Sequence, residues 1–454
     1  MKTMLQHVMG CRLNHAEAER VRAAFALAGW RVLGGSSSSD SATASQVDVF
    51  HLHTCAVTAR AQSEAVRRVR AAKRAGAGRI VVSGCVANLP AAAAPLRAAG
   101  ATDVISRLDA PPQVGANEGG GEDPASIVRM ALLAPSQTIV PPAPDALRAM
   151  RTPVKIQDGC DVRCSYCIVP DARGAPRSLP LPDIISACRA AVSSGPREIV
   201  LTGVNTARWR DGSLTLPDAA RAVAALPGVL RVRVASVEPD SAVPGIVELM
   251  AESEGRVCPT LHLPLQSGSD RILRAMRRRY TATEYRETVL QAVKRLPHLG
   301  LGTDVIVGFP GETEDDFALT LSLVEELPFS NVHVFPYSER PGTPAASMPG
   351  VVPPSERRRR AKALSDAAAR KRELFAAGFV GRDVEILAEA AAAEGGVSGW
   401  SGEYLRAAVR DAPASAIGTL VRARVVSADG DALLCQLRRD ACQNARPVVS
   451  SVAP

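Results

Sequence analysis

The 454-residue sequence contains no uncharged apolar run of about 18 residues or more, the length that a membrane-spanning helix needs. Its first residues, MKTMLQHVMGCRLN, have neither the apolar region nor the cleavage site of a signal peptide. We therefore expect a cytoplasmic protein that has no membrane partner.

Aromatic residues are also scarce, at 4% of the chain, so a nucleic-acid surface would depend on Arg and Lys rather than on base stacking. The net charge of +8 favours a polyanionic partner, although many soluble proteins are equally basic. Cytoplasmic thiols stay reduced, so the ten cysteines indicate ligands, nucleophiles or small buried residues rather than disulfides.

The pattern of apolar runs predicts an α/β protein with three domains. Alternating strand and helix patterns predict an open parallel sheet in residues 1–140, interrupted by polar insertions at 34–46 and 115–124 and ended by a Pro-rich joint at 140–144. In residues 145–376 the same alternation predicts a partial (βα)6 barrel. Period-two patterns in residues 380–440 predict a small antiparallel β-barrel.

Cys160, Cys164 and Cys167 follow the first predicted strand of the barrel, and no fourth cysteine lies nearby. Three thiolates in one loop can hold three corners of an inorganic cluster, and barrel loops at this end of the strands carry catalytic residues. A zinc knuckle completed by a distant histidine is an alternative, but zinc sites favour paired CxxC units and the loop contains no histidine.

Cys11, Cys55 and Cys85 are far apart in the sequence, but each follows a predicted strand. The carboxyl ends of parallel strands lie along one edge of a sheet, so the three loops can converge there. A cysteine after a strand is often only a small buried residue. Three of them in a chain that already has a cluster motif predict a second three-thiolate site.

The spacing Cys160-x3-Cys164-x2-Cys167, with Tyr166 before the last cysteine, resembles that of the radical S-adenosylmethionine (SAM) enzymes. Over nearly its whole length the chain further resembles the radical-SAM methylthiotransferase family, whose C-terminal RNA-binding domain is called TRAM. The motifs that carry this resemblance are GCRLNHAEAE (10–19), TCAVT (54–58), SGCVA (83–87), CSYCIVP (164–170), LTGVN (201–205), LPLQSGSD (263–270), TDVIVGFPGET (303–313) and FPYSERPGTPAA (335–346).

The resemblance implies two [4Fe-4S] clusters. Cys160, Cys164 and Cys167 would be the catalytic ligands of the first, whose open iron binds SAM and yields a 5′-deoxyadenosyl radical. Cys11, Cys55 and Cys85 would hold an auxiliary cluster that carries the sulfur. A second SAM would methylate that sulfur, and an external electron donor of the flavodoxin or ferredoxin type would supply electrons.

Polar residues near the barrel strand ends are candidates for SAM contacts. Beside Tyr166 they are Gly203, Asn205, Ser236, Glu238, Gln266 and Asp304. The chain departs from the family pattern at His53, where an Asn is usual, and at Asp171 and Ala175. These departures leave the cysteines intact and affect the residues around them.

The motifs resemble most closely the MtaB subgroup, which adds a methylthio group to C2 of N6-threonylcarbamoyladenosine at position 37 of tRNA. MiaB-like action on isopentenyladenosine and RimO-like action on an aspartate of a ribosomal protein are the alternatives. A non-catalytic, zinc-stabilised RNA-binding protein is the alternative from another class. Candidate RNA contacts are Arg277, Arg278, Arg279, Tyr404 and Arg406. Cys188, Cys258, Cys435 and Cys442 have no partner pattern and are expected to be structural.

Overall fold

The computed structural model describes residues 1–33, 47–106, 123–133, 150–195 and 197–438. The chain divides into two compact units. The first contains residues 1–146, 153–194 and 338–346, and the second contains 147–152, 195–337 and 347–454. The predicted insertion at 34–46, nearly all of the one at 115–124 and the Pro-rich joint lie outside the described residues.

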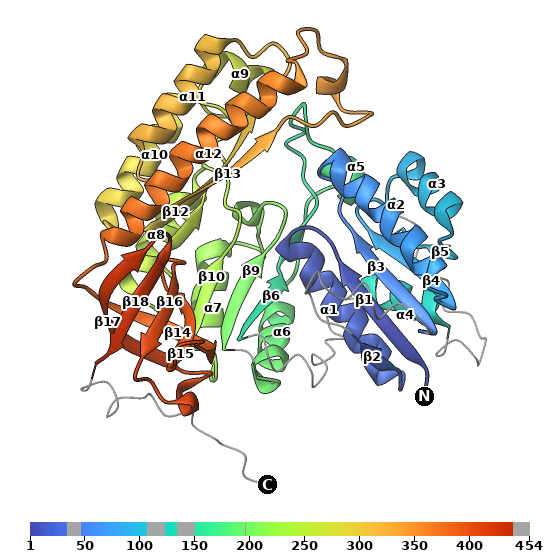
Figure 1. Ribbon diagram of the computed structural model, residues 1–454, viewed down its shortest axis with the longest axis horizontal. Coiled ribbons are helices and arrows are strands. Elements are labelled where there is room, and N and C mark those ends of the chain that lie inside the picture. The colour runs from blue at the N-terminus through green and yellow to red at the C-terminus, as the bar shows by residue number, and fades with distance from the viewer. Residues whose placement is uncertain (34–46, 107–122, 134–149, 196, 439–454) are drawn as a thin grey trace. The chain divides into compact units, whose positions relative to one another are not determined.

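A parallel sheet with strand order β2-β1-β3-β4-β5 forms the centre of the first unit (Figure 1). Its strands are β1 (Thr3–Val8), β2 (Arg31–Leu33), β3 (Val49–Thr54), β4 (Arg79–Gly84) and β5 (Asp103–Val104). Its helices are α1 (Arg12–Leu27), α2 (Ala59–Arg74), α3 (Pro90–Ala99) and α4 (Pro124–Leu133). This arrangement confirms the predicted open parallel sheet.

The period-two pattern of β3 explains how this sheet is covered. Phe50 and Leu52 point to the face packed against α2 and α3. Val49 points to the opposite face, where Phe25 of α1 and Ile127 of α4 form the core. His51 and His53 share the face of Val49, so polar side chains continue that face toward the carboxyl edge of the sheet.

The first unit also contains most of β6 (Arg151–Lys155) and the loop that carries the second group of cysteines. Here β7 (Gln157–Asp158) and β8 (Arg177–Ser178) pair as a short antiparallel ladder on either side of that loop. Helices α5 (Val169–Arg173) and α6 (Leu181–Ser193) complete this part, together with most of the 3-10 helix η3 (Pro344–Ser347).

Parallel strands form the central part of the second unit. Their bounds are β9 (Glu198–Thr202), β10 (Arg231–Val234), β11 (Thr260–His262), β12 (Gly300–Val307) and β13 (Asn331–Pro336). Within this unit β9 pairs with β10 and the order β11-β12-β13 forms a second sheet, all pairs being parallel, and the Val232 bridge to Val257 links β10 to the segment before β11. These parallel strands, which alternate with helices along the described part of the chain, confirm the predicted α/β core.

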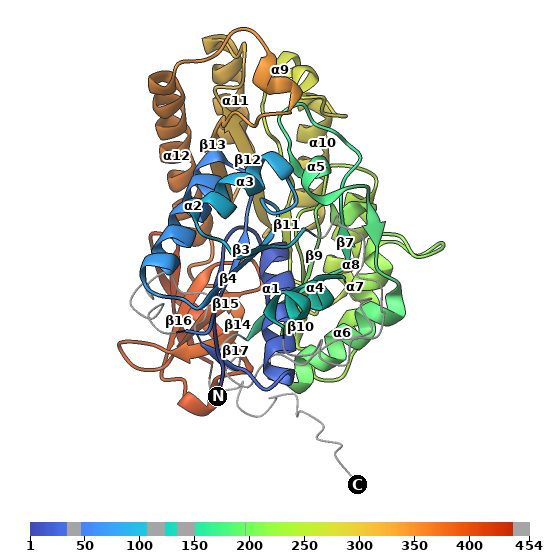
Figure 2. The same cartoon turned by 90° about the vertical axis from the view of Figure 1, so that its right-hand side faces the viewer.

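Helices lie outside these strands, as in a barrel. They are η2 (Thr206–Arg208), α7 (Leu216–Ala224), α8 (Ala242–Glu252), α9 (Asp270–Ala275), α10 (Ala282–Arg295), α11 (Glu314–Glu326) and α12 (Pro354–Ala377). Figure 2 shows α10, α11 and α12 alongside β12 and β13. The capping boxes at Thr281 and Thr313 define where α10 and α11 begin.

The chain then forms a closed barrel with the order β14-β15-β16-β18-β17. Its elements are β14 (Asp383–Ala391), β15 (Val397–Ser401), β16 (Arg406–Arg410), η4 (Ala414–Ala416), β17 (Leu420–Asp429) and β18 (Ala432–Leu437). All pairs are antiparallel except β16 with β18.

The strands that sequence patterns missed are short or irregular, because β2, β5 and β15 offer little periodicity to detect. Helix α1 begins at Arg12, directly after Cys11. Among the described residues, no helix is both long and apolar enough to span a membrane.

Candidate active site

The three N-terminal cysteines lie at the carboxyl edge of the parallel sheet. Cys55 and Cys85 directly follow β3 and β4, and Cys11 precedes the first residue of α1. The register pairs Val8 with His53 and Thr54 with Gly84, so these strands end at nearly the same level. The sequence therefore placed these cysteines correctly along the sheet.

The loops that carry these cysteines approach each other closely. Gly10 has a φ of 101°, and a Cβ on it would lie only 2.7 Å from Cys55 Cβ. The side-chain amide of Asn14 donates to the backbone oxygens of Met9 (2.7 Å) and Thr54 (2.9 Å). Asn14 thereby ties together the ends of β1 and β3.

The three thiols interact electrostatically with one another. Burial raises the pKa of the Cys85 thiol to about 11, and it also raises the pKa of Cys55. In the metal-free protein both thiols therefore carry protons at neutral pH. A metal that binds here must displace these protons, so binding should weaken as the pH falls.

The second group of cysteines lies in the loop between β7 and β8. Cys164 is buried, and Cys160 and Cys167 are partly exposed. The Cys160 amide donates to Gly174 O (3.1 Å), and the Cys167 amide donates to Cys164 O (3.0 Å). These backbone bonds fold the loop back on itself and orient its cysteines.

The sharp turn into this loop depends on a glycine. Gly159 has a φ of 72°, and a Cβ there would lie 2.1 Å from the backbone oxygen of Ala175. Ala175, where the chain departs from the family pattern, therefore lies against Gly159 with its backbone rather than with its side chain. Asp171 is exposed on α5.

A buried polar network joins the two cysteine-bearing regions inside the first unit. Arg173 Nη1 donates to Glu17 Oε1 and to Asp158 Oδ1, each at 3.1 Å, and Nη2 donates to Asn14 Oδ1 at 2.7 Å. Lys155 Nζ donates to the same two carboxylates. Helix α1, which starts after Cys11, is thus bonded to the residues before Cys160.

His53 belongs to the same network. Its Nδ1 lies 2.8 Å from Ser83 Oγ, and its Nε2 lies 3.3 Å from Glu17 Oε2. The Ser83 hydroxyl also contacts His51, whose pKa is lowered by burial. His53, which stands where the family usually has Asn, is therefore a buried residue with polar partners on both ring nitrogens. It lies two residues before Cys55, near the carboxyl end of β3.

Among the described residues, no three His, Cys, Asp or Glu side chains surround a single point as the ligands of one metal ion do. A four-iron cluster has a different requirement, because each thiolate binds its own iron. Both groups supply soft thiolates without carboxylate or imidazole ligands, which is the donor set of an iron–sulfur cluster. The residues present fit such a group at both sites.

Most of the residues expected to contact SAM lie in the second unit, whereas Tyr166 lies on a turn of the cysteine loop. Gly203 and Asn205 follow β9, Ser236 and Glu238 follow β10, and Gln266 follows β11. Asp304 differs, because it lies within β12 and pairs with His262 at 3.1 Å.

Two of these residues have a left-handed backbone, Ser236 with a φ of 52° and Gln266 with a φ of 67°. The Gln266 amide donates to Asp304 O at 2.8 Å, and Gln266 O accepts from the Ile306 amide at 2.9 Å. The turn after β11 is thereby fixed beside β12. Burial raises the pKa of Glu238, an effect that the neighbouring Arg278 opposes.

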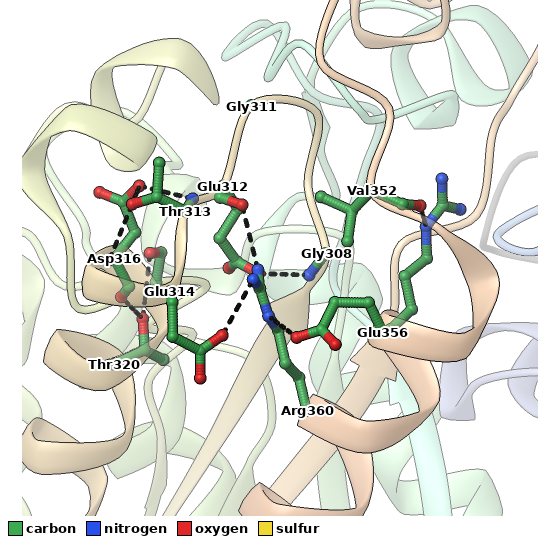
Figure 3. A network of polar contacts seen from close by, with 12 residues as sticks. Gly308, Gly311, Glu312, Thr313, Glu314, Asp316, Thr320, Val352, Glu356 and Arg360 are labelled. Carbon is green, nitrogen blue, oxygen red and sulfur yellow. Dashed lines mark hydrogen bonds and ion pairs between the residues drawn. The ribbon is translucent and has the colours of Figure 1, made fainter.

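The loop after β12 is held by an ion pair that the sequence did not reveal (Figure 3). Glu312 Oε2 accepts from the Gly308 amide (2.6 Å) and from Arg360 Nη1 of α12 (2.7 Å). The capping box of Thr313 and Asp316 then starts α11. This network fixes the conformation of the GFPGET loop at the carboxyl end of its strand.

Two of the expected RNA contacts have partners within the chain. Arg278 has a side chain that is only 3% exposed and forms an ion pair with Glu238. Tyr404 stacks on Trp400 with a ring separation of 4.7 Å, and the Arg233 guanidinium lies 4.7 Å from its ring centre. Both side chains are therefore oriented by contacts within the chain.

The other expected RNA contacts are on the surface. Arg277 and Arg279 are exposed on either side of Arg278. Arg406 is exposed too, with its guanidinium 5.6 Å from the Trp400 ring centre. Cys188, Cys258 and Cys435 are buried, as expected for structural residues, and Cys442 lies outside the described residues.

A core of parallel strands and a CxxxCxxC loop together define the class of radical-SAM proteins. Residues 154–324 match the Radical SAM superfamily, and residues 3–104 match the Uncharacterized protein family UPF0004. A solved structure of TsrM from Kitasatospora setae, with cobalamin and a [4Fe-4S] cluster bound, has a TM-score of 0.52 at 13% identity. The match covers 76% of this chain and 77% of that one, and at this identity it supports the fold alone.

Two relatives identify the family within this class. The tRNA-2-methylthio-N(6)-dimethylallyladenosine synthase of Sorangium cellulosum is 34% identical over 96% of this chain and 94% of the relative. The threonylcarbamoyladenosine tRNA methylthiotransferase MtaB of Bacillus subtilis is 32% identical over 94% of each chain. The chain belongs to the radical-SAM tRNA methylthiotransferase family, whose members use SAM and [4Fe-4S] clusters.

Proposed function

We propose that this protein adds a methylthio group to C2 of N6-threonylcarbamoyladenosine in tRNA, in the cytoplasm. Two three-cysteine sites within one compact unit are the observation that supports the chemistry most directly. The relative from B. subtilis, whose name specifies threonylcarbamoyladenosine, supports this substrate. The motifs GCRLN, LTGVN and FPYSERPGT support the same subgroup.

The six cysteines have separate roles in this proposal. Cys160, Cys164 and Cys167 would hold the cluster that binds SAM, and Cys11, Cys55 and Cys85 would hold the auxiliary cluster. When bound, these groups supply a carbon radical able to abstract hydrogen from an unactivated C–H bond and a sulfur atom to replace that hydrogen.

The chain itself contributes position and a controlled environment. The network around Arg173 fixes the two cysteine-bearing regions relative to each other within the first unit. In the second unit, Gly203, Asn205, Ser236, Glu238 and Gln266 would contact SAM from the ends of the strands, and Asp304 would do so from within β12. Because SAM cleavage consumes an electron, an external donor of the flavodoxin or ferredoxin type would be needed.

Exposed arginines would contribute to tRNA binding. Arg277, Arg279 and Arg406 remain the candidates for phosphate contacts, because their side chains reach the surface. Arg278 and Tyr404 are proposed contacts too, and each also has a partner within the chain.

Isopentenyladenosine is the second candidate substrate, because the relative from S. cellulosum is named for dimethylallyladenosine. Mass spectrometry of tRNA nucleosides from a host without this gene distinguishes the two. We expect methylthio-threonylcarbamoyladenosine to disappear and to return when the gene is restored. If that nucleoside is unchanged and methylthio-isopentenyladenosine is lost, the substrate assignment is wrong.

A further inference from the structure

A segment far along the chain bonds to the surroundings of both cysteine sites. Residues 338–346 follow β13 but belong to the first unit. Near the start of this segment, the Ser338 hydroxyl accepts from the amide of Ala59, four residues after Cys55 (3.0 Å). Near its end, the Ala345 amide donates to Ser165 O, beside Cys164 (2.8 Å).

Arg340 is the charged side chain that this segment directs into the interior. It is 4% exposed, and its Nη2 donates to Gln62 Oε1 of α2 at 3.0 Å. Its backbone oxygen accepts from the Thr343 hydroxyl at 2.7 Å, which closes the turn that follows. The first bond holds the guanidinium group, and the second holds the backbone from which it extends.

Arg340 interacts electrostatically with the thiol of Cys55. Within the described part of the chain, the buried Nε of Arg340 has no hydrogen-bond partner. A buried charged donor without a partner destabilises a protein, so this position favours a nearby anionic acceptor.

Arg173 is also close to these cysteines, but its environment differs. Its guanidinium group already donates to Glu17, Asp158 and Asn14. Its charge is therefore balanced within the polar network. Arg340 is bonded instead to a neutral amide, so no carboxylate balances its charge through that bond.

We propose that Arg340 is a positioning residue of the N-terminal cysteine site, and that its buried Nε–H donates to a sulfur atom of the cluster bound there. The inference rests on the proposed role of Cys11, Cys55 and Cys85 as cluster ligands. A charge-assisted bond of this kind stabilises the thiolate-bound site. It also favours the reduced cluster, because hydrogen bonds to sulfur and nearby positive charge raise its reduction potential.

The test uses the full chain with Cys160, Cys164 and Cys167 changed to Ala, so that only the N-terminal site binds iron. This parent is reconstituted with iron and sulfide under anaerobic conditions. A redox titration followed by electron paramagnetic resonance then measures the reduced fraction of the cluster at each potential. Arg340→Met removes the charge and the donor, Arg340→Lys keeps the charge, and Gln62→Met removes the group that holds Arg340. Arg60→Met, an exposed arginine on the same helix as Gln62, is the matched control.

At the parent's midpoint potential, we expect Arg340→Met to lower the ratio of reduced to oxidised cluster about tenfold. Arg340→Lys should recover part of that loss, and Gln62→Met should cause a smaller change in the same direction. A ratio for Arg340→Met equal to that of Arg60→Met would overturn the inference.

Two further results are decisive. If Arg340→Met does not fold, as judged by circular dichroism, Gln62→Met decides alone, and an unchanged ratio overturns the inference. If the parent binds no iron, the assignment of the N-terminal cysteines fails, and the role of Arg340 fails with it. The iron content thus separates failure of the proposed function from failure of this inference.

Discussion

The two cysteine sites offer the same three thiols, but different parts of the fold bring those thiols together. Cys160, Cys164 and Cys167 lie within eight positions of the chain, in one loop between β7 and β8. Cys11, Cys55 and Cys85 follow three different strands and meet because the sheet aligns the ends of those strands. One site depends on local backbone geometry, and the other depends on correct assembly of the sheet.

This difference determines what disrupts each site. A change to the sheet or to its glycines should affect the dispersed site alone, and a change to the loop should affect the local site alone. A change to the network that joins them should affect the whole first unit. Three sets of substitutions test these expectations, in order of decreasing effect.

Arg173→Met should have the largest effect. Glu17 and Asp158 are both nearly fully buried. After the substitution, Lys155 would be the lysine or arginine left in the network to balance these two carboxylates. Breaking a buried ion pair in this way costs about 3–5 kcal/mol. We expect the first unfolding transition of the metal-free protein, followed by circular dichroism in urea, to move to a lower midpoint.

The exposed Arg177 lies in the same segment and provides the control. Arg177→Met should change the stability by less than about 0.5 kcal/mol. Equal transitions for the two variants would mean that the buried network does not hold the first unit together.

Two glycine substitutions test the independence of the sites. Gly10→Ala places a methyl group against Cys55, and Gly159→Ala places one against the Ala175 backbone. Each also costs about 1–2 kcal/mol because alanine disfavours a positive φ. We expect each reconstituted variant to lose roughly half of the eight irons that two clusters contain.

The products distinguish the two glycine variants. Gly10→Ala should still form 5′-deoxyadenosine from SAM, whereas Gly159→Ala should form much less. If both variants lose this activity equally, the sites are not independent of each other.

The smallest effect is expected on the surface. Changing Arg277 and Arg279 together to Ala should weaken tRNA binding a few-fold and reduce the slope of log affinity against log salt by roughly one per lost phosphate contact. Fluorescence anisotropy at several salt concentrations measures this slope. Both clusters should stay intact, and an unchanged slope would remove these arginines from the interface.

The sequence was sufficient to predict the parallel sheet, the barrel strands and the position of all six cysteines. Spacing revealed Cys160, Cys164 and Cys167, and strand ends revealed Cys11, Cys55 and Cys85. These features repeat or follow regular patterns, so a single sequence carries them.

The residues that support the sites could not be predicted in this way. Arg173 and Arg340 come near the N-terminal cysteines only through tertiary structure. In the run RAMRRRY (274–280), composition did not distinguish Arg278, whose side chain is buried, from the exposed Arg277 and Arg279. Which arginine of a short turn is buried depends on the residues that pack against the turn. The ring contacts of Tyr404 with Trp400 and with two arginines could not be predicted either, because they too depend on tertiary structure.

The division of roles between the two cysteine sites is the central claim, and one paired assay tests it most directly. Reconstituted Cys85→Ala and Cys164→Ala proteins are incubated with SAM, a reductant and tRNA, and 5′-deoxyadenosine and methylthio-nucleoside are measured in the same samples. We predict that Cys85→Ala forms 5′-deoxyadenosine without any methylthio-nucleoside, and that Cys164→Ala forms neither. A Cys85→Ala protein that no longer cleaves SAM, beside a Cys164→Ala protein that still does, would contradict the account.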